Sequence, residues 1–91
     1  MIANDMIVVR SSSVVHTEMN EQTMLMNIEE GKYYSLSQVG SQIWRLLENP
    51  TRVDALIAQL EEEFEVTEQE CRDQTHEFLQ DLIKRQLAQT V

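Results

Sequence analysis

The first half of the chain alternates apolar and polar residues, a pattern that is typical of half-buried β-strands. Three such runs occur, over residues 14–19, 24–28 and 32–36. The turns between them are short and polar, and Gly31 can take the positive φ that a tight hairpin needs. The pattern therefore predicts three strands joined into an antiparallel meander.

The second half of the chain repeats its apolar residues at the spacing of an α-helix. Ser37, Thr51 and Thr67 are expected to cap the starts of three helices, because each hydroxyl can accept a hydrogen bond from a first-turn backbone N–H. Pro50 ends the first helix, and the third helix is the longest. Strands first and helices after predict an α+β fold, a three-stranded antiparallel meander followed by three helices, which is winged-helix-like.

Ninety-one residues suffice for one domain. Residues 1–13 end in three serines, and we expect them to form a flexible N-terminal arm with at most one short strand, over residues 6–10. The domain itself is expected to span residues 14–91.

The chain carries 16 acidic and 7 basic residues, for a formal net charge of −9. Binding to nucleic acid or to anionic membranes takes clustered lysine and arginine, so this balance argues against both. No run approaches the roughly 20 apolar residues of a membrane span. No basic segment precedes the apolar run at residues 6–9, as a signal peptide would require. We therefore expect a soluble, cytoplasmic protein.

The residues that could carry catalysis are few. The single cysteine, Cys71, excludes an internal disulfide and a cysteine-rich zinc site. Cys71 and His76 would point about 140° apart on one helix, which disfavours a nucleophile pair, and Cys71 is expected in the core. The acidic residues at 61–65 fan around a helix, Trp44 is expected to pack in the core, and His16 is expected on the outer face of a strand. The sequence predicts no enzyme, no metal and no cofactor.

What remains is a binding surface on the third predicted strand. An edge strand offers unpaired N–H and C=O groups to another chain, and residues 32–36 contain no proline that would block pairing. Tyr33 and Tyr34 are adjacent, so they cannot both face the core. Beside a long helix this strand would form a groove that a peptide could enter as an added strand.

A family pattern coincides with this strand. The stretch GKYYSLSQVGSQIWRLL, with MLMNIEE before it, resembles the PqqD-like family, also called RiPP recognition elements. Members read as a Leu-rich strand ending in Asp, then Gly-x-Tyr-aromatic-x-Leu-Asn, then Gly-x-x-Ile-Trp-x-Leu. The resemblance covers roughly residues 14–87. Asn27 stands where Asp is usual, which removes a charge, and Ser37 stands where Asn is usual but remains a good N-cap.

The resemblance implies a function. Family members bind the leader segment of a ribosomally made precursor peptide, which adds as a strand on the third strand against the third helix. Strand pairing would then fall on Lys32, Tyr33, Tyr34, Ser35 and Leu36. The helical wall would come from Arg72, Thr75, His76, Leu79, Leu82 and Ile83, with the flank that faces the groove left open. The acidic excess would favour a basic leader.

As a small free-standing protein of this length, the chain looks most like the family members of lasso-peptide pathways. There the implied partners are a cysteine-protease-like leader peptidase and an ATP-dependent macrolactam synthetase. Three alternatives stay open: a peptide chaperone acting with a radical enzyme in pyrroloquinoline quinone or another RiPP pathway, a winged-helix DNA-binding regulator, and a scaffold subunit that binds only the protease.

Overall fold

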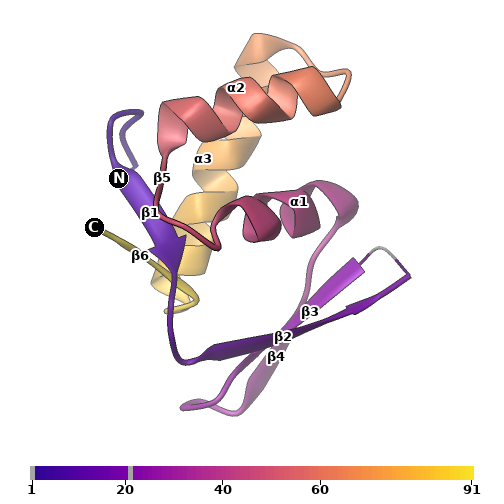
Figure 1. Ribbon diagram of the computed structural model, residues 1–91, viewed down its shortest axis with the longest axis vertical. Coiled ribbons are helices and arrows are strands. Elements are labelled where there is room, and N and C mark those ends of the chain that lie inside the picture. The colour runs from indigo at the N-terminus through magenta and orange to yellow at the C-terminus, as the bar shows by residue number, and fades with distance from the viewer. Residues whose placement is uncertain (1, 21) are drawn as a thin grey trace.

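The computed structural model describes residues 2–20 and 22–91. Met1 and Glu21, which belong to the expected arm and the first expected turn, lie outside the described residues. The elements in chain order are β1 (Ile7–Arg10), β2 (Val14–Met19), β3 (Gln22–Asn27), β4 (Lys32–Ser35), α1 (Gln38–Leu46), β5 (Thr51–Arg52), α2 (Val53–Glu63), α3 (Glu68–Lys84) and β6 (Ala88–Thr90). Figure 1 shows α1 between the meander and α2, with α3 passing behind them.

The expected meander is confirmed, with β2, β3 and β4 paired antiparallel in that order. Leu25 lies in register between His16 and Tyr34 and is fully buried, so all three side chains are on the face that turns toward the helices. The prediction that His16 lies on the outer face is therefore wrong. Its ring meets that of Trp44 edge-on at 6.2 Å, although the His16 residue as a whole is exposed.

A second sheet, with strand order β5-β1-β6, joins the two ends of the chain. Val8 pairs with Thr51 on one side and with Thr90 on the other, and it is fully buried. Ile2 is also part of the core. The strand expected at residues 6–10 is present, but a separate arm with a domain boundary at residue 14 does not describe this arrangement. The N-terminal segment is an integral part of the fold.

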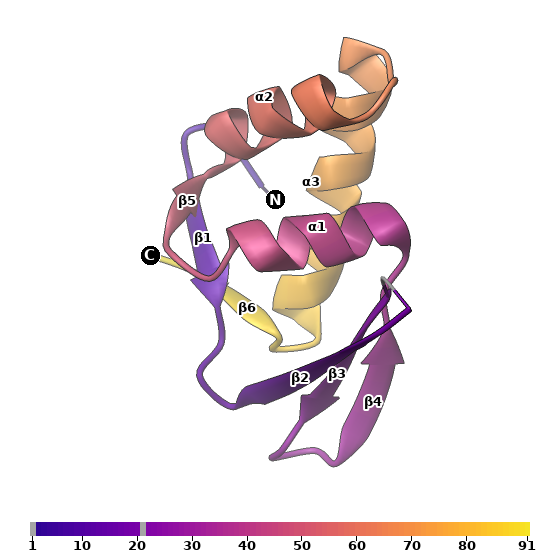
Figure 2. The ribbon, with the colours of Figure 1, turned by 45° about the vertical axis from the view of Figure 1, so that its right-hand side comes forward.

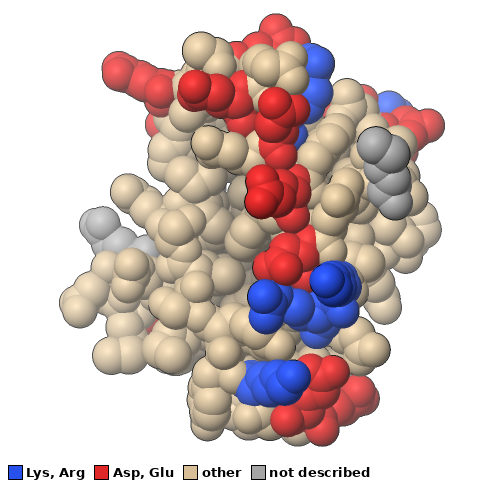
Figure 3. All heavy atoms as spheres, turned by 180° about the vertical axis from the view of Figure 1, so that it is seen from behind, with Lys and Arg blue, Asp and Glu red and all other residues tan. Residues whose placement is uncertain are grey.

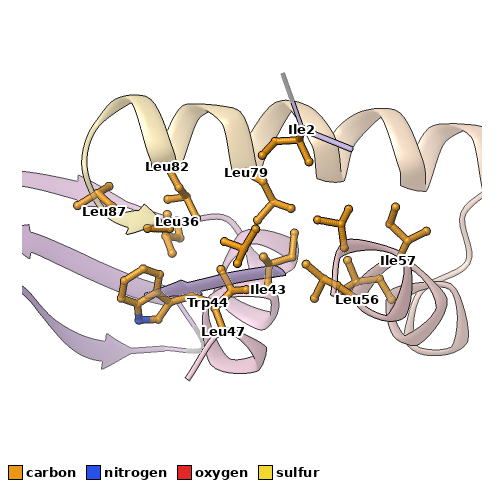
Figure 4. Close-up of a cluster of buried hydrophobic side chains, with 14 of the residues drawn as sticks. Ile2, Leu36, Ile43, Trp44, Leu47, Leu56, Ile57, Leu79, Leu82 and Leu87 are labelled. Carbon is orange, nitrogen blue, oxygen red and sulfur yellow. The ribbon is translucent and has the colours of Figure 1, made fainter. Parts of the chain in front are cut away.

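The main core lies where α1 and α3 meet over the inner face of the meander. In Figure 4, Leu79 and Leu82 point from α3 toward Leu36 and Ile43, and Trp44 lies beneath them. Trp44 is 1% exposed, which confirms its predicted place in the core. Burial of this many large apolar side chains supplies the main favourable term in folding.

The helix starts follow the sequence at two of three places. Gly40 N–H donates to Ser37 Oγ at 3.1 Å, and Glu70 N–H donates to Thr67 Oγ1 at 3.2 Å, so these caps are confirmed. The predicted Thr51 cap is wrong, because Thr51 belongs to β5 and its hydroxyl donates to the carbonyl oxygens of Leu46 and Asn49. The first N–H groups of α2 donate instead to backbone carbonyls of the N-terminal segment, within residues 4–6. Such long-range caps leave no local sequence signal.

Candidate functional site

The strand β4 has an open edge. Among the described residues it pairs only with β3, on its other side. Leu36 N–H donates to the carbonyl of Thr23 at 2.8 Å. Because hydrogen-bonded pairs alternate along an antiparallel ladder, Tyr33 and Ser35 direct their N–H and C=O groups toward the open edge. This edge can therefore accept a further strand through Tyr33 and Ser35.

A groove of about 360 Å³ runs between β4 and α3. We call it the β4–α3 groove. It is lined by Tyr33, Tyr34, Ser35, Leu36, Ser37, Phe78, Asp81, Leu82, Arg85 and Leu87. Figure 2 shows β4 as the strand of the meander with a free outer edge and α3 crossing beside the sheet. An extended peptide that paired with β4 would lay alternate side chains against α3.

Arg85 connects the two walls of this groove. Its guanidinium lies 5.0 Å from the centre of the Tyr34 ring and pairs with Asp81 at 3.0 Å. The hydrogen bond to Asp81, and then the contact with Tyr34, raise the pKa of Arg85 above its ordinary value. Cation–π contacts at exposed sites are worth about 0.5–1 kcal/mol, so this contact can yield to an incoming peptide.

The structure brings together only part of the expected helical wall. All three apolar-stripe residues are buried, with Leu82 and Thr75 2% exposed and Leu79 0% exposed, but of these only Leu82 lines the groove. The other expected residues, on the opposite flank of α3, are Arg72, His76 and Ile83. Successive residues of a helix are 100° apart around its axis, which places these three about 160° from the groove residues Phe78, Asp81 and Arg85. In keeping with this, His76 contacts Asn4 of the N-terminal segment at 2.7 Å, and Arg72 pairs with Glu68. The helical repeat of apolar residues in the sequence identifies the core stripe of α3 but not the flank that borders β4.

The helical residues of the groove that sequence reasoning missed are Phe78, Asp81 and Arg85. Phe78 is only partly buried, and it lines the groove. A Cβ atom on Gly40 would lie 3.1 Å from Phe78 Cε1, so the glycine lets the ring approach α1 closely. The Gly-x-x-Ile-Trp motif of the sequence therefore carries a signal for this contact.

Beyond Phe78 the surface continues into a second hollow, of about 170 Å³, between α1 and α3. Val39, Ile43 and Phe64 line it together with Phe78. Cys71 also lines it and is 5% exposed, which confirms its expected place in the core. Burial raises the pKa of its thiol, so at neutral pH the sulfur is protonated and a poor nucleophile.

Asn27 ties the turn before β4 to the end of α3. The residue is fully buried, and its Oδ1 accepts hydrogen bonds from the N–H groups of Glu29 and Glu30 at 3.0 and 3.2 Å. Its Nδ2 donates a hydrogen bond to the carbonyl oxygen of Arg85 at 3.5 Å. A carboxylate could accept the first two bonds but could not donate the third. The change from the usual Asp thus adds a link between the turn before β4 and the end of α3.

Two further kinds of site are absent from residues 2–20 and 22–91. Within them, no three His, Cys, Asp or Glu side chains are placed to hold a metal ion. Within the same residues, no helix combines the length and the apolar character needed to cross a membrane.

Comparisons with known proteins show which chains this one is similar to. A family model described as coenzyme PQQ synthesis protein D (PqqD) matches residues 22–88. The solved structure of TbiB1 in complex with the TbiA(beta) leader peptide is 27% identical to this chain, with a TM-score of 0.83 over 89% of this chain and 94% of that one. Lasso peptide synthetase B1 complexed with the leader peptide has a TM-score of 0.80 over 90% and 96% of the two chains, and at 15% identity it shows the fold alone. A search of curated protein sequences gives no match.

Proposed function

This chain belongs to the PqqD family, and we propose that it is a non-catalytic recognition protein that binds the leader segment of a ribosomally synthesised precursor peptide. The observation that carries the proposal is the open edge of β4 beside α3. The matched TbiB1 structure supports it, because that protein is in complex with a leader peptide.

The leader would bind by strand addition. Its backbone would pair with Tyr33 and Ser35, while its alternate side chains would enter the β4–α3 groove against Phe78 and Leu82. Tyr34 and Leu36 face the groove with their side chains, and Lys32 lies on the same face of β4, because alternate strand residues share a face. This assignment keeps the expected strand and moves the helical wall to the flank of Phe78 and Arg85.

A rigid groove suits a disordered ligand. Ordering a free peptide costs roughly 1–2 kcal/mol per residue, so a protein that is already folded leaves that cost on the peptide alone. Main-chain hydrogen bonds then supply affinity that depends little on leader sequence, and the groove side chains supply selectivity. Micromolar or tighter binding, about −8 kcal/mol or stronger, is the expected range.

We further propose that the bound leader is delivered, in the cytoplasm, to a cysteine-protease-like leader peptidase and an ATP-dependent macrolactam synthetase of a lasso-peptide pathway. An enzyme would have to dock away from the groove. The outer face of the meander offers exposed Val15, Met19 and Tyr33, and it is continuous with β4. Pull-down of the peptidase with and without leader, by wild type and by V15E, tests this step; equal capture by V15E would place the docking surface elsewhere.

Leader binding itself is tested by titration of a fluorescently labelled leader. Suitable probes are the TbiA(beta) leader peptide and the leader segments of precursors encoded beside this gene. Ser35→Pro removes the N–H that points to the open edge, and proline is tolerated on edge strands, so we expect at least tenfold weaker binding in a folded protein. Ser35→Ala is the matched control and should bind as wild type does. Saturable binding that S35P leaves unchanged would place the peptide outside the β4 edge.

The family match also favours a second candidate. The family model is described as a protein of coenzyme PQQ synthesis, so a role as peptide chaperone in that or another pathway, acting with a radical enzyme, shares the same groove. The two candidates differ in the partner enzyme and not in the fold. Pull-down with each enzyme class in the presence of its own precursor separates them.

A further inference from the structure

The only two lysines of the chain meet at one end of the β4–α3 groove. Lys32 comes from the start of β4 and Lys84 from the last turn of α3. They line a polar hollow together with Glu30, Tyr34, Asp81 and Arg85. In Figure 3, basic side chains gather in the lower part of this face, below a row of acidic ones.

Neither lysine ammonium group forms an ion pair within the described part of the chain. Four arginines form ion pairs there, and neither lysine does. Asp81 shares the hollow, but its carboxylate is held by Arg85 at 3.0 Å. Among the described residues of this hollow, Glu30 is therefore the one carboxylate without an ion pair, whereas both lysines are without one. A local cationic site of this kind stands out in a protein whose formal charge is −9.

The helix alone does not account for this pair. The negative end of the α3 dipole favours a cation at Lys84. It gives no reason for Lys32, whose side chain is on the same face of β4 as Tyr34 and Leu36 and so turns toward α3. Two like charges that share a hollow repel each other, and an arriving carboxylate would relieve that repulsion.

We propose that Lys32 and Lys84 bind a carboxylate side chain of the leader, so that the leader carries Asp or Glu at this end of the groove. The inference rests on the proposed function and adds to it the chemistry and the direction of the ligand. The other end of the groove, at Leu36 and Phe78, is apolar. The two ends therefore select a leader that places an apolar side chain at one and an acidic side chain at the other.

The spacing of the two side chains follows from the geometry of the elements. From Phe78 to Lys84 the helix rises about 9 Å, at about 1.5 Å per residue. A strand covers this distance in about three residues, and every second residue faces the helix. The acidic residue of the leader should therefore lie two or four positions from the apolar residue that contacts Phe78. This replaces the expectation of a generally basic leader with a specific position for an acid.

The test is a selection of short random peptides displayed on phage, with immobilised protein as bait. Wild type should enrich peptides that carry Asp or Glu two or four positions from an apolar residue. The charge-reversed variant K32E/K84E should enrich Lys or Arg at that same position. R72E is the matched control, since Arg72 lies on the opposite flank of α3, and it should enrich the same peptides as wild type.

Affinities of one enriched peptide then give the size of the effect. Exposed ion pairs are worth little each, so K32Q and K84Q should each weaken binding about twofold to fivefold, with a loss that shrinks at high salt. Enrichment without a preferred acid, or a preference that charge reversal leaves unchanged, would overturn the carboxylate site while leaving leader binding intact. A third outcome is that none of the recovered peptides loses binding in the S35P variant. That result would overturn the proposed function and the carboxylate site together.

Discussion

Ser41 of α1 accepts a hydrogen bond from the backbone N–H of Thr23 on β3 at 3.0 Å, and both residues are fully buried. This bond fastens the first helix to the strand that supports β4. Ser41→Ala would leave the Thr23 N–H buried without an acceptor, so we expect the free energy of unfolding to fall by about 1–3 kcal/mol. Urea denaturation followed by circular dichroism measures it; an unchanged midpoint would contradict the assigned bond.

Thr23 provides the opposite change at the same place. Its Oγ1 is buried and has no hydrogen-bond partner among the described residues. Thr23→Val replaces this hydroxyl with a methyl group of nearly the same shape, so stability should stay the same or rise by about 1 kcal/mol. The same denaturation assay applies. A loss as large as that of S41A would mean that the hydroxyl has a partner, such as a water molecule.

Gly40 and Phe78 should be energetically coupled. Gly40→Ala gains about 1 kcal/mol of helix propensity, but the new methyl group would press on the Phe78 ring, so the two effects should nearly cancel. In an F78A background the overlap is gone, and G40A should then stabilise the protein by about 1 kcal/mol. A double-mutant cycle in urea measures the coupling. Equal effects of G40A in both backgrounds would show that the ring does not approach α1 in this way.

Removal of residues 1–10 should abolish the cooperative unfolding transition. The deletion takes away the central strand of the second sheet, two core side chains, Ile2 and Val8, and the carbonyl groups that receive the first N–H groups of α2. Each buried N–H left without a partner costs about 1–3 kcal/mol. Val8→Ala is the milder counterpart and should cost about 2 kcal/mol. A truncated protein that still unfolds cooperatively would restore the interpretation of these residues as an arm.

The thiol of Cys71 should resist alkylation in the native protein. Burial raises its pKa above the ordinary value of 9.0, which keeps the unreactive protonated form. Iodoacetamide should therefore label the folded protein far more slowly than the urea-unfolded one. The protonated thiol contributes fully to the free energy of unfolding below that ordinary pKa, and this contribution is lost as the pH rises through the raised pKa of the folded state. Wild type should therefore lose more stability than C71A between about pH 8 and about pH 10. Equal losses would show that the thiol pKa is unshifted.

The sequence predicts the meander and the three helices well because both depend on local periodicity. Alternation sets the strands around Leu25, and hydroxyl caps at Ser37 and Thr67 set two helix starts. The family resemblance read from residues 24–47 is confirmed by the match of the PqqD model. The second sheet escapes such reasoning, since its strands are two to four residues long and pair over nearly the whole chain.

For the site, the strand is predictable and the helical wall is not. The edge position of β4 follows from the order of the elements, whereas the flank of α3 that borders it depends on how the helix is rotated over the sheet. On a helical wheel Phe78 and Arg72 lie on the two sides of the core stripe, so the repeat alone does not decide which of them borders β4. The packing of α3 against α2 and β6, with Phe78 against Gly40 of α1, decides that Phe78 borders β4.

The pairing of Val8 with Thr90 has a consequence for how the protein is made. The meander consists of two local hairpins, which can close within microseconds once residues 14–35 are available. The sheet of β1, β5 and β6 needs the last residues of the chain, and closing so long a loop is slow. The binding edge can therefore form during synthesis, before the rest of the fold holds it in place. During that interval, as in the folded protein, the unpaired edge of β4 can accept a strand of another chain, so self-association during translation is a hazard that this order of assembly creates.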